Sequence, residues 1–359
     1  MIRQKQIEYF KMKGIEVVVI LPNWRSSELV EEDGLIKIPF NKNIKFQVLK
    51  EYLGLSECYL DPWVGEAYKY LMPLVKREDI VFASPSEDLG CYKIASKLKK
   101  SIGMRYVVNL HDPLSFSIVN GKKVGSRPHA NREKSEQRYL GNADLIITCS
   151  MTYCNALKSK YHDISDRIIN SYFGYIREEK LGTKKFSNKI RVAYGGTFGR
   201  AQQPETLAQA VADLENVEIY YIGNHKSYKP LQPFRSRCVL VENMSNNDYN
   251  KFMMDNIDVG FVSLSKVWYG ACVPSKIFEY INLGLPILGA LPDGDAKDII
   301  NHHGYGVAVN YNDRLGLKKA LNTFLDRERY LVFKNKLIQD RKLWSIERHC
   351  HEIYKYLIK

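Results

Sequence analysis

The chain has 359 residues, enough for two domains, and its composition of 45% hydrophobic and 26% charged residues excludes a largely disordered protein. A formal net charge of +13 at pH 7 favours anionic partners such as phosphates or an acidic membrane surface. No dense run of Lys or Arg marks a nucleic-acid-binding arm, so we expect no nucleic-acid partner.

The seven cysteines are widely spaced, and no pair has the spacing of a zinc or redox site. We therefore expect reduced thiols, no metal and a location in the cytoplasm. The sequence contains no apolar stretch long enough to span a membrane, and residues 1–14 are too polar for a signal peptide. The basic charge permits peripheral contact with the acidic inner face of a cell membrane.

The first half of the chain alternates between helical and strand patterns. Strands separated by helices indicate a parallel sheet with helices on its faces. The predicted helices are 1–13, 89–102, 132–140 and 150–161, and the predicted strands are 16–21, 79–83, 105–110, 144–149 and 167–170.

A charged segment with few apolar residues, 176–190, is the expected linker, and the alternation restarts after it. We therefore predict an α/β fold of two tandem Rossmann-like domains, in which ligands bind at the carboxyl ends of strands. The predicted strands of the second half are 189–194, 217–222, 237–241, 258–262, 285–289 and 306–309, and the predicted helices are 203–212, 245–254, 275–283, 313–325 and about 327–357.

The first candidate for chemistry is the glycine loop Tyr194–Arg200, which reads YGGTFGR directly after a strand. Glycines let a ligand approach the backbone, and an arginine offers a fork of donors to a diphosphate. An ordinary turn with a surface arginine is an equally good interpretation, because short glycine motifs are weak evidence. The candidate donor-binding residues here are Gly195, Gly196, Gly199 and Arg200.

The second candidate is the helix start at Pro274 and Ser275. With Ser275 as the N-cap, the first-turn N–H groups and Lys276 converge on one place that suits an anion. Glu279 lies about one turn further on, where its carboxylate can accept two ribose hydroxyls. The alternative for Glu279 is a solvated helix residue, which its mostly apolar neighbours disfavour.

Two further groups are singled out by their position after strands. His111 and Asp112 follow the strand 105–110, where Asp112 can accept a hydrogen bond from an attacking hydroxyl and His111 can carry a proton. A loop aspartate before proline is the commoner explanation of Asp112. Asn243 and Met244 follow another strand and are candidates to meet a nucleotide base through their backbone.

Several segments together resemble the family-four retaining glycosyltransferases of GT-B fold. These segments are PSKIFEYINLGLPIL, YGGTFGRAQQPETLAQAV, and ADLIITCSMTYCNALKSKY followed by RIINSYFGY. The resemblance implies that Glu279 binds the nucleotide ribose and that Ser275 and Lys276 hold the diphosphate or sugar. It also implies that Gly196 and Arg200 face the phosphates and that Asp112 lies near the acceptor.

The chain departs from this family at three places. Ala271 stands where many members have a second glutamate, and no second basic residue follows Arg200 closely, a role that Lys276 can fill. The family begins with a strand and a glycine-rich loop, whereas this sequence starts on the following helix, so that strand is either truncated or absent. The domains implied are 1–178 for the acceptor, 179–335 for the donor, and 336–359 as a helix returning to the first domain.

The expected function is transfer of a sugar from a nucleotide diphosphate sugar, a UDP-, GDP- or similar sugar, to a hydroxyl acceptor. The resemblance implies a retaining hexosyltransferase in cell-surface polysaccharide synthesis, with a saccharide or lipid-linked acceptor. The absence of a metal-binding carboxylate pair in the sequence favours metal-independent action without a further cofactor. Two alternatives stay open: a nucleotide-binding protein with weak or no transferase activity, as Ala271 suggests, and a sugar-nucleotide epimerase.

Overall fold

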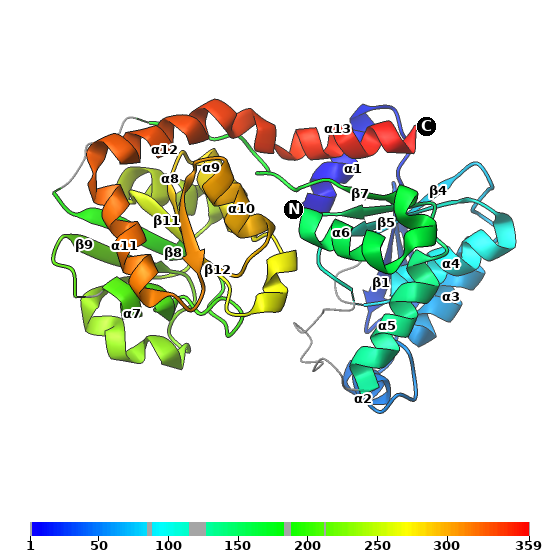
Figure 1. Ribbon diagram of the computed structural model, residues 1–359. Coiled ribbons are helices and arrows are strands. Elements are labelled where there is room, and N and C mark those ends of the chain that lie inside the picture. The colour runs from blue at the N-terminus through cyan, green and yellow to red at the C-terminus, as the bar shows by residue number, and fades with distance from the viewer. Residues whose placement is uncertain (1, 85–87, 115–126, 183–187, 212, 359) are drawn as a thin grey trace. The chain divides into compact units, whose positions relative to one another are not determined.

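The computed structural model describes residues 2–84, 88–114, 127–182, 188–211 and 213–358. The chain forms two compact units: unit 1 comprises Met1–Tyr172 with Cys350–Lys359, and unit 2 comprises Phe173–His349 (Figure 1). Each unit combines sheets with surrounding helices, which confirms the predicted α/β fold. The predicted domains are 1–178, 179–335 and 336–359, whereas unit 2 comprises both 173–178 and 336–349. Residues 183–187 of the expected linker and Ala212 lie outside the described residues.

Unit 1 contains two sheets. The first has the order β1-β3-β2, with β1 parallel and β2 antiparallel to β3, and the second is a parallel sheet of order β4-β5-β6-β7. The strands are β1 (Val19–Trp24), β2 (Val30–Glu32), β3 (Leu35–Phe40), β4 (Ile80–Ala83), β5 (Arg105–Leu110), β6 (Leu145–Thr148) and β7 (Ile168–Asn170).

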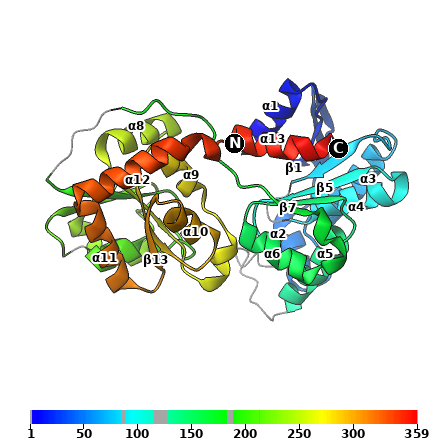
Figure 2. The same cartoon turned by 45° about the horizontal axis from the view of Figure 1, so that its top comes forward.

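The helices of unit 1 cover both faces of the parallel sheet. α4 and α6 contact its strands, while α1 and the end of α13 bury Phe10, Ile353 and Leu357 with the strand residues Val107 and Ile147. α1 and α13 run close together in Figures 1 and 2, and the Tyr9 hydroxyl lies 3.0 Å from His351 Nδ1. The helices are α1 (Ile2–Met12), α2 (Ile44–Tyr52), α3 (Asp61–Leu71), α4 (Gly90–Ile102), α5 (Arg127–Leu140), α6 (Met151–Lys160), the 3-10 helix η2 (His162–Arg167) and α13 (Ile346–Leu357).

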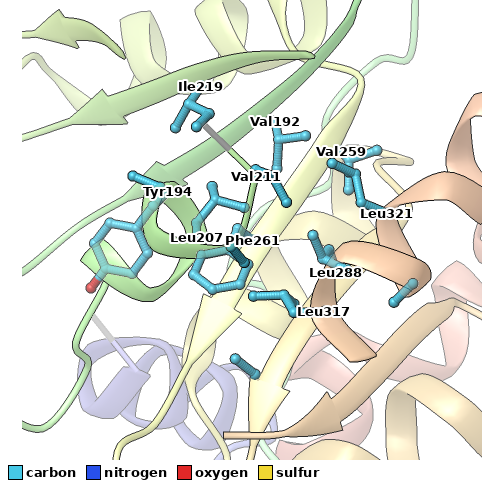
Figure 3. Close-up of a cluster of buried hydrophobic side chains, with 14 of the residues drawn as sticks. Val192, Tyr194, Leu207, Val211, Ile219, Val259, Phe261, Leu288, Leu317 and Leu321 are labelled. Atoms are coloured by element: carbon cyan, nitrogen blue, oxygen red, sulfur yellow. The ribbon is translucent and has the colours of Figure 1, made fainter. Parts of the chain in front are cut away.

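Unit 2 is built on one parallel six-stranded sheet of order β10-β9-β8-β11-β12-β13. Figure 3 shows one layer of its core, in which side chains of β8, β9 and β11 meet those of helices α7 and α11. The strands are β8 (Ile190–Gly195), β9 (Val217–Ile222), β10 (Cys238–Val241), β11 (Val259–Ser263), β12 (Ile287–Leu291) and β13 (Gly306–Asn310). The helices are α7 (Glu205–Val211), α8 (Asn246–Asn256), α9 (Ser275–Asn282), α10 (Asp295–His302), α11 (Arg314–Leu325) and α12 (Arg327–Asp340), with 3-10 helices η3 (Lys229–Arg237), η4 (Val267–Ala271) and η5 (Arg341–Trp344).

The single helix predicted over about 327–357 is wrong, because the chain breaks it into α12, η5 and α13. The break occurs where Tyr175 crosses it: the Tyr175 N–H donates to the Trp344 carbonyl, and the Ile346 N–H donates to the Tyr175 carbonyl. Both bonds measure 2.9 Å and replace bonds that a continuous helix would make. Across the described residues, no helix has both the length and the apolar character needed to cross a membrane.

Candidate functional site

The glycine loop of unit 2 begins at the carboxyl end of β8 and is held by Ser265, which follows the neighbouring strand β11. The Ser265 hydroxyl donates to the Arg200 carbonyl at 2.7 Å, and the Ser265 N–H donates to the Ala201 carbonyl at 2.8 Å. Arg200 itself has an exposed side chain. The loop backbone is therefore fixed, while the guanidinium of Arg200 projects toward solvent, where an anionic ligand can reach it.

The glycines of this loop meet different neighbours. A Cβ on Gly195 would lie 2.3 Å from the Tyr249 hydroxyl oxygen, so Gly195 makes room for a ring from α8. A Cβ on Gly196 would lie 3.0 Å from Lys276 Cε, and its φ of +138° is a conformation that glycine adopts without strain. Gly199 faces Gln202 of its own loop. Of the three glycines, Gly196 alone thus places the loop beside a basic side chain.

Helix α9 begins next to this loop, but its N-cap differs from the prediction. The N-cap is Pro274, and Ser275 is the first helical residue with an exposed side chain, so the assignment of Ser275 as N-cap is wrong. The extended ψ of 132° at Pro274, whose ring fixes φ, ends the preceding loop and starts the helix one residue earlier. Pro274 makes no side-chain cap hydrogen bond, and the Ile277 N–H donates to the Pro274 carbonyl at 3.1 Å. The N–H groups of Ser275 and Lys276 are therefore the ones that this helix start offers to an anion.

Lys276 links the helix to the glycine loop. Its Nζ lies 2.7 Å from Glu279 Oε2 and 4.7 Å from the centroid of the Tyr249 ring. Burial by itself lowers the pKa of Lys276, but the neighbouring Tyr249 and Glu279 outweigh it and raise the pKa above its ordinary value. The ammonium is therefore charged at neutral pH and is held against the loop at Gly196.

Glu279 lies on the first turns of α9, as the spacing from Ser275 predicts. Its side chain is 37% exposed and pairs with Lys276, so it is neither buried nor simply solvated. A carboxylate at this place is within reach of a ligand that approaches the helix start. Ala271 closes η4, which carries no carboxylate.

The loop between β10 and α8 carries Asn243 and Met244. Asn243 is exposed and Met244 half-buried, and Ser245 caps α8 by accepting a hydrogen bond from the Asp248 N–H. Strands β8, β9 and β10 are parallel neighbours, so the loops at their carboxyl ends share one edge of the sheet. This edge therefore contains the glycine loop and the Asn243–Met244 loop together.

Two residues at this edge escaped sequence reasoning. Tyr249 sits in an ordinary helical pattern, and His225 follows β9 without any motif around it. His225 is 3% exposed, its ring lies 6.1 Å from that of Phe198, and neither ring nitrogen has a hydrogen-bond partner among the described residues. Only the fold brings these two side chains to the loops.

Unit 1 holds the remaining candidates. His111 follows β5, and its Nε2 lies 3.4 Å from both Ser84 Oγ, at the end of β4, and Asn109 Nδ2. Asp112 is exposed, and it adds to the effect of burial in raising the pKa of Cys149, the residue that follows β6. His111 and Asp112 therefore lie at the carboxyl edge of the parallel sheet of unit 1. No cluster of three or more metal-ligating side chains occurs in the described parts of the chain.

Comparison with known proteins finds solved structures that share this architecture. No family model and no curated relative matches the chain. Solved structures do: a sucrose-phosphate synthase from Thermosynechococcus elongatus superposes with a TM-score of 0.68 at 15% identity, covering 99% of this chain and 92% of its own.

Two further structures are similar. Anabaena HepE in complex with UDP-glucose has a TM-score of 0.63 at 14% identity, covering 89% of this chain and 90% of its own. A trehalose 6-phosphate synthase from Burkholderia multivorans has a TM-score of 0.64 at 10% identity, covering 95% of this chain and 87% of its own. At these identities the likeness establishes the fold.

Proposed function

We propose that the protein is a glycosyltransferase that moves a sugar from a nucleotide diphosphate sugar to a hydroxyl acceptor. The observation that supports it best is the juxtaposition of Gly196, Lys276 and the uncapped start of α9, with Glu279 one turn away. A positive charge and open N–H groups suit a diphosphate, and the carboxylate suits a ribose. The similar Anabaena HepE was determined with UDP-glucose, which fits a donor of this class.

In the proposed reaction the bond between the anomeric carbon and the diphosphate oxygen breaks, and a bond from that carbon to the acceptor oxygen forms. Lys276, Arg200 and the N–H groups of α9 stabilise the negative charge on the departing diphosphate. Because these groups supply positive charge, we propose metal-independent action. Asp112 accepts the hydrogen bond of the attacking hydroxyl and His111 carries its proton. Retention at the anomeric carbon and hexosyl transfer rest on the family resemblance.

The donor is tested with a thermal-shift panel of UDP, GDP, ADP and their sugars, since a ligand of the native state raises its stability. We expect one nucleotide to raise the melting temperature of the wild type, and K276A and E279A to lose most of that shift. The matched control is the exposed (i, i+3) pair Glu66 and Lys69 on α3, whose alanine variants should respond like the wild type. Absence of a shift with every nucleotide would reject the donor site.

A second candidate is a nucleotide-binding protein that transfers sugar poorly. Ala271 favours it, because η4 offers no carboxylate to the donor sugar. Product analysis separates the possibilities: a transferase requires a saccharide or lipid-linked acceptor, an epimerase changes the sugar nucleotide alone, and a binding protein yields no product. We further propose a cytoplasmic location and a role in making cell-surface polysaccharide or glycoconjugate.

A further inference from the structure

Helix α2 of unit 1 (Ile44–Tyr52), labelled near the bottom of Figure 1, presents apolar side chains to solvent. Together with the residues that follow the helix, this face forms what we call the α2 patch. Its members are all large apolar residues between 47% and 73% exposed: Phe46, Val48, Leu49, Tyr52, Leu53 and Leu55. Burying such residues against water is favourable, so six of them on one short segment indicate a surface that docks.

The polarity of α2 is inverted relative to an ordinary surface helix. Its inward face carries Gln47, which is buried, and Glu51, which accepts hydrogen bonds from Arg132 and from the Tyr59 N–H at 3.0 Å each. Arg132 is itself 4% exposed. Rolling the helix to bury the α2 patch would separate this buried ion pair, which is costly. The contacts of the polar face of α2 therefore keep its apolar face exposed to solvent.

Three lysines lie on or beside the α2 patch. Lys42 and Lys45 are exposed beside it, and Lys50 Nζ lies 4.9 Å from the Phe46 ring centroid. The one acidic residue of the helix, Glu51, is turned inward and paired with Arg132. The outer face thus combines apolar side chains with lysines, the combination that lets a helix lie in the interface of an anionic bilayer.

We propose that the α2 patch docks unit 1 onto an anionic lipid surface, with the helix lying along the interface. A second copy of the chain fits the patch less well, because a two-fold contact would bring its lysines against the same lysines. The proposal goes beyond sugar transfer and does not require it. Docking on a lipid surface would bring unit 1 to the membrane that holds a lipid-linked acceptor.

The test is flotation of the full chain with vesicles of phosphatidylcholine alone and of phosphatidylcholine with phosphatidylglycerol. We expect binding to the anionic vesicles at low salt, and little binding to the neutral ones. K42Q/K45Q should bind roughly thirtyfold more weakly, at about fivefold for each lysine. F46S/L49S/L53S should weaken binding by about tenfold or more, because less apolar surface enters the interface.

The matched control is L315S/V332S, which removes two exposed apolar residues of unit 2 and should leave vesicle binding unchanged. Melting temperatures and the response to nucleotides verify that each variant is folded and keep this test separate from the donor site. The proposal is overturned if the wild-type chain does not bind anionic vesicles. It is also overturned if F46S/L49S/L53S binds them as tightly as the wild type. A concentration-dependent dimer that F46S/L49S/L53S abolishes would assign the surface to a second copy and overturn it too.

Discussion

The ring of Tyr249 packs against the backbone of Gly195, and its centroid lies 4.7 Å from the ammonium nitrogen of Lys276. We predict that Y249L weakens nucleotide binding by about five- to thirtyfold, because a desolvated cation–π contact contributes about 1–2 kcal/mol. Y249F should bind within about twofold of the wild type. The ring remains in that variant, and the hydroxyl has no hydrogen-bond partner among the described residues. Calorimetric titration with the nucleotide found in the thermal-shift panel measures the affinities of both variants.

Leu lacks the aromatic face that Phe offers to Lys276, so equal affinities of Y249L and Y249F would show that the cation–π contact does not position Lys276. The control for packing is the melting temperature without ligand. Y249L should reduce it more than Y249F, because it leaves space beside Gly195.

At this scale, local patterns predict part of the site. The spacing from Ser275 to Glu279 places both on one helix, because a helix repeats every 3.6 residues. The cap at Pro274 was missed because Ser is the commoner capping residue and the choice depends on the backbone of the preceding loop. Tyr249 and His225 were missed because their role depends on which loops the six-stranded sheet brings together.

Among the elements of unit 1, Glu57, which precedes α3, connects the helices α4 and α5. Its carboxylate accepts hydrogen bonds from Ser135 at 2.5 Å and Tyr139 at 2.7 Å on α5, and it pairs with Lys93 on α4 at 2.9 Å. Burial by itself raises the pKa of Glu57, but these three partners outweigh it and hold the pKa below its ordinary value of 4.5. The charged form therefore stabilises the packing of α4 and α5 around the start of α3.

We predict that E57Q lowers the free energy of unfolding by about 1–3 kcal/mol at pH 7, the range for hydrogen bonds to a charged group. A lowered folded-state pKa contributes stability that is complete above the unfolded-state pKa and is lost as the pH falls through the folded-state value. The difference in unfolding free energy between wild type and E57Q should thus be constant from pH 7 to about 5 and shrink below pH 4.5. Urea unfolding across this range measures it, with E66Q as the exposed control; a gap that grows on acidification would contradict the assignment.

The junction of α12 and η5 in unit 2 depends on a chain of buried hydrogen bonds. Trp344 Nε1 donates to the Tyr305 hydroxyl at 2.7 Å, and that hydroxyl donates to Asp340 Oδ2 at 3.0 Å. Y305F removes the shared oxygen and leaves the indole N–H without its acceptor. We predict a loss of about 1–3 kcal/mol in unfolding free energy, measured by urea unfolding. Y311F, a change of a half-buried tyrosine one strand further on, is the control and should have little effect.

The same region shows the limit of periodicity as a predictor of elements. The helical pattern over 327–357 is real, because α12 and α13 occupy most of it. The break between them depends on Tyr175, which is remote in sequence and supplies two backbone hydrogen bonds. The sequence predicts no element over 22–78, where the structure has β2, β3, α2 and α3. Helix α2 has its apolar residues outside and Gln47 inside, so its pattern indicates no core-facing side.

At the scale of the whole molecule, the repeated alternation of strands and helices was sufficient to predict two α/β units. The buried strands β8, β11 and β12 are short apolar runs, and such runs between helices have few other folds available to them. The division of unit 1 into two sheets was not predictable. In the first sheet β2 pairs antiparallel to β3. The two sheets stay separate because β1 and β4 are each the end strand of their own sheet.

Because each unit has its own buried core, ligand binding should protect one unit far more than the other. We predict that the donor nucleotide slows amide hydrogen exchange in unit 2, most strongly at the glycine loop after β8, at α8 and at the start of α9. Peptides of β5 and β6 in unit 1 should exchange at the rate of the free protein, since the groups proposed to hold the nucleotide all belong to unit 2. Mass spectrometry of wild type and E279A, each with and without nucleotide, gives the comparison. Equal protection in E279A, or protection confined to unit 1, would place the nucleotide away from Lys276 and Glu279 and would require a different donor site.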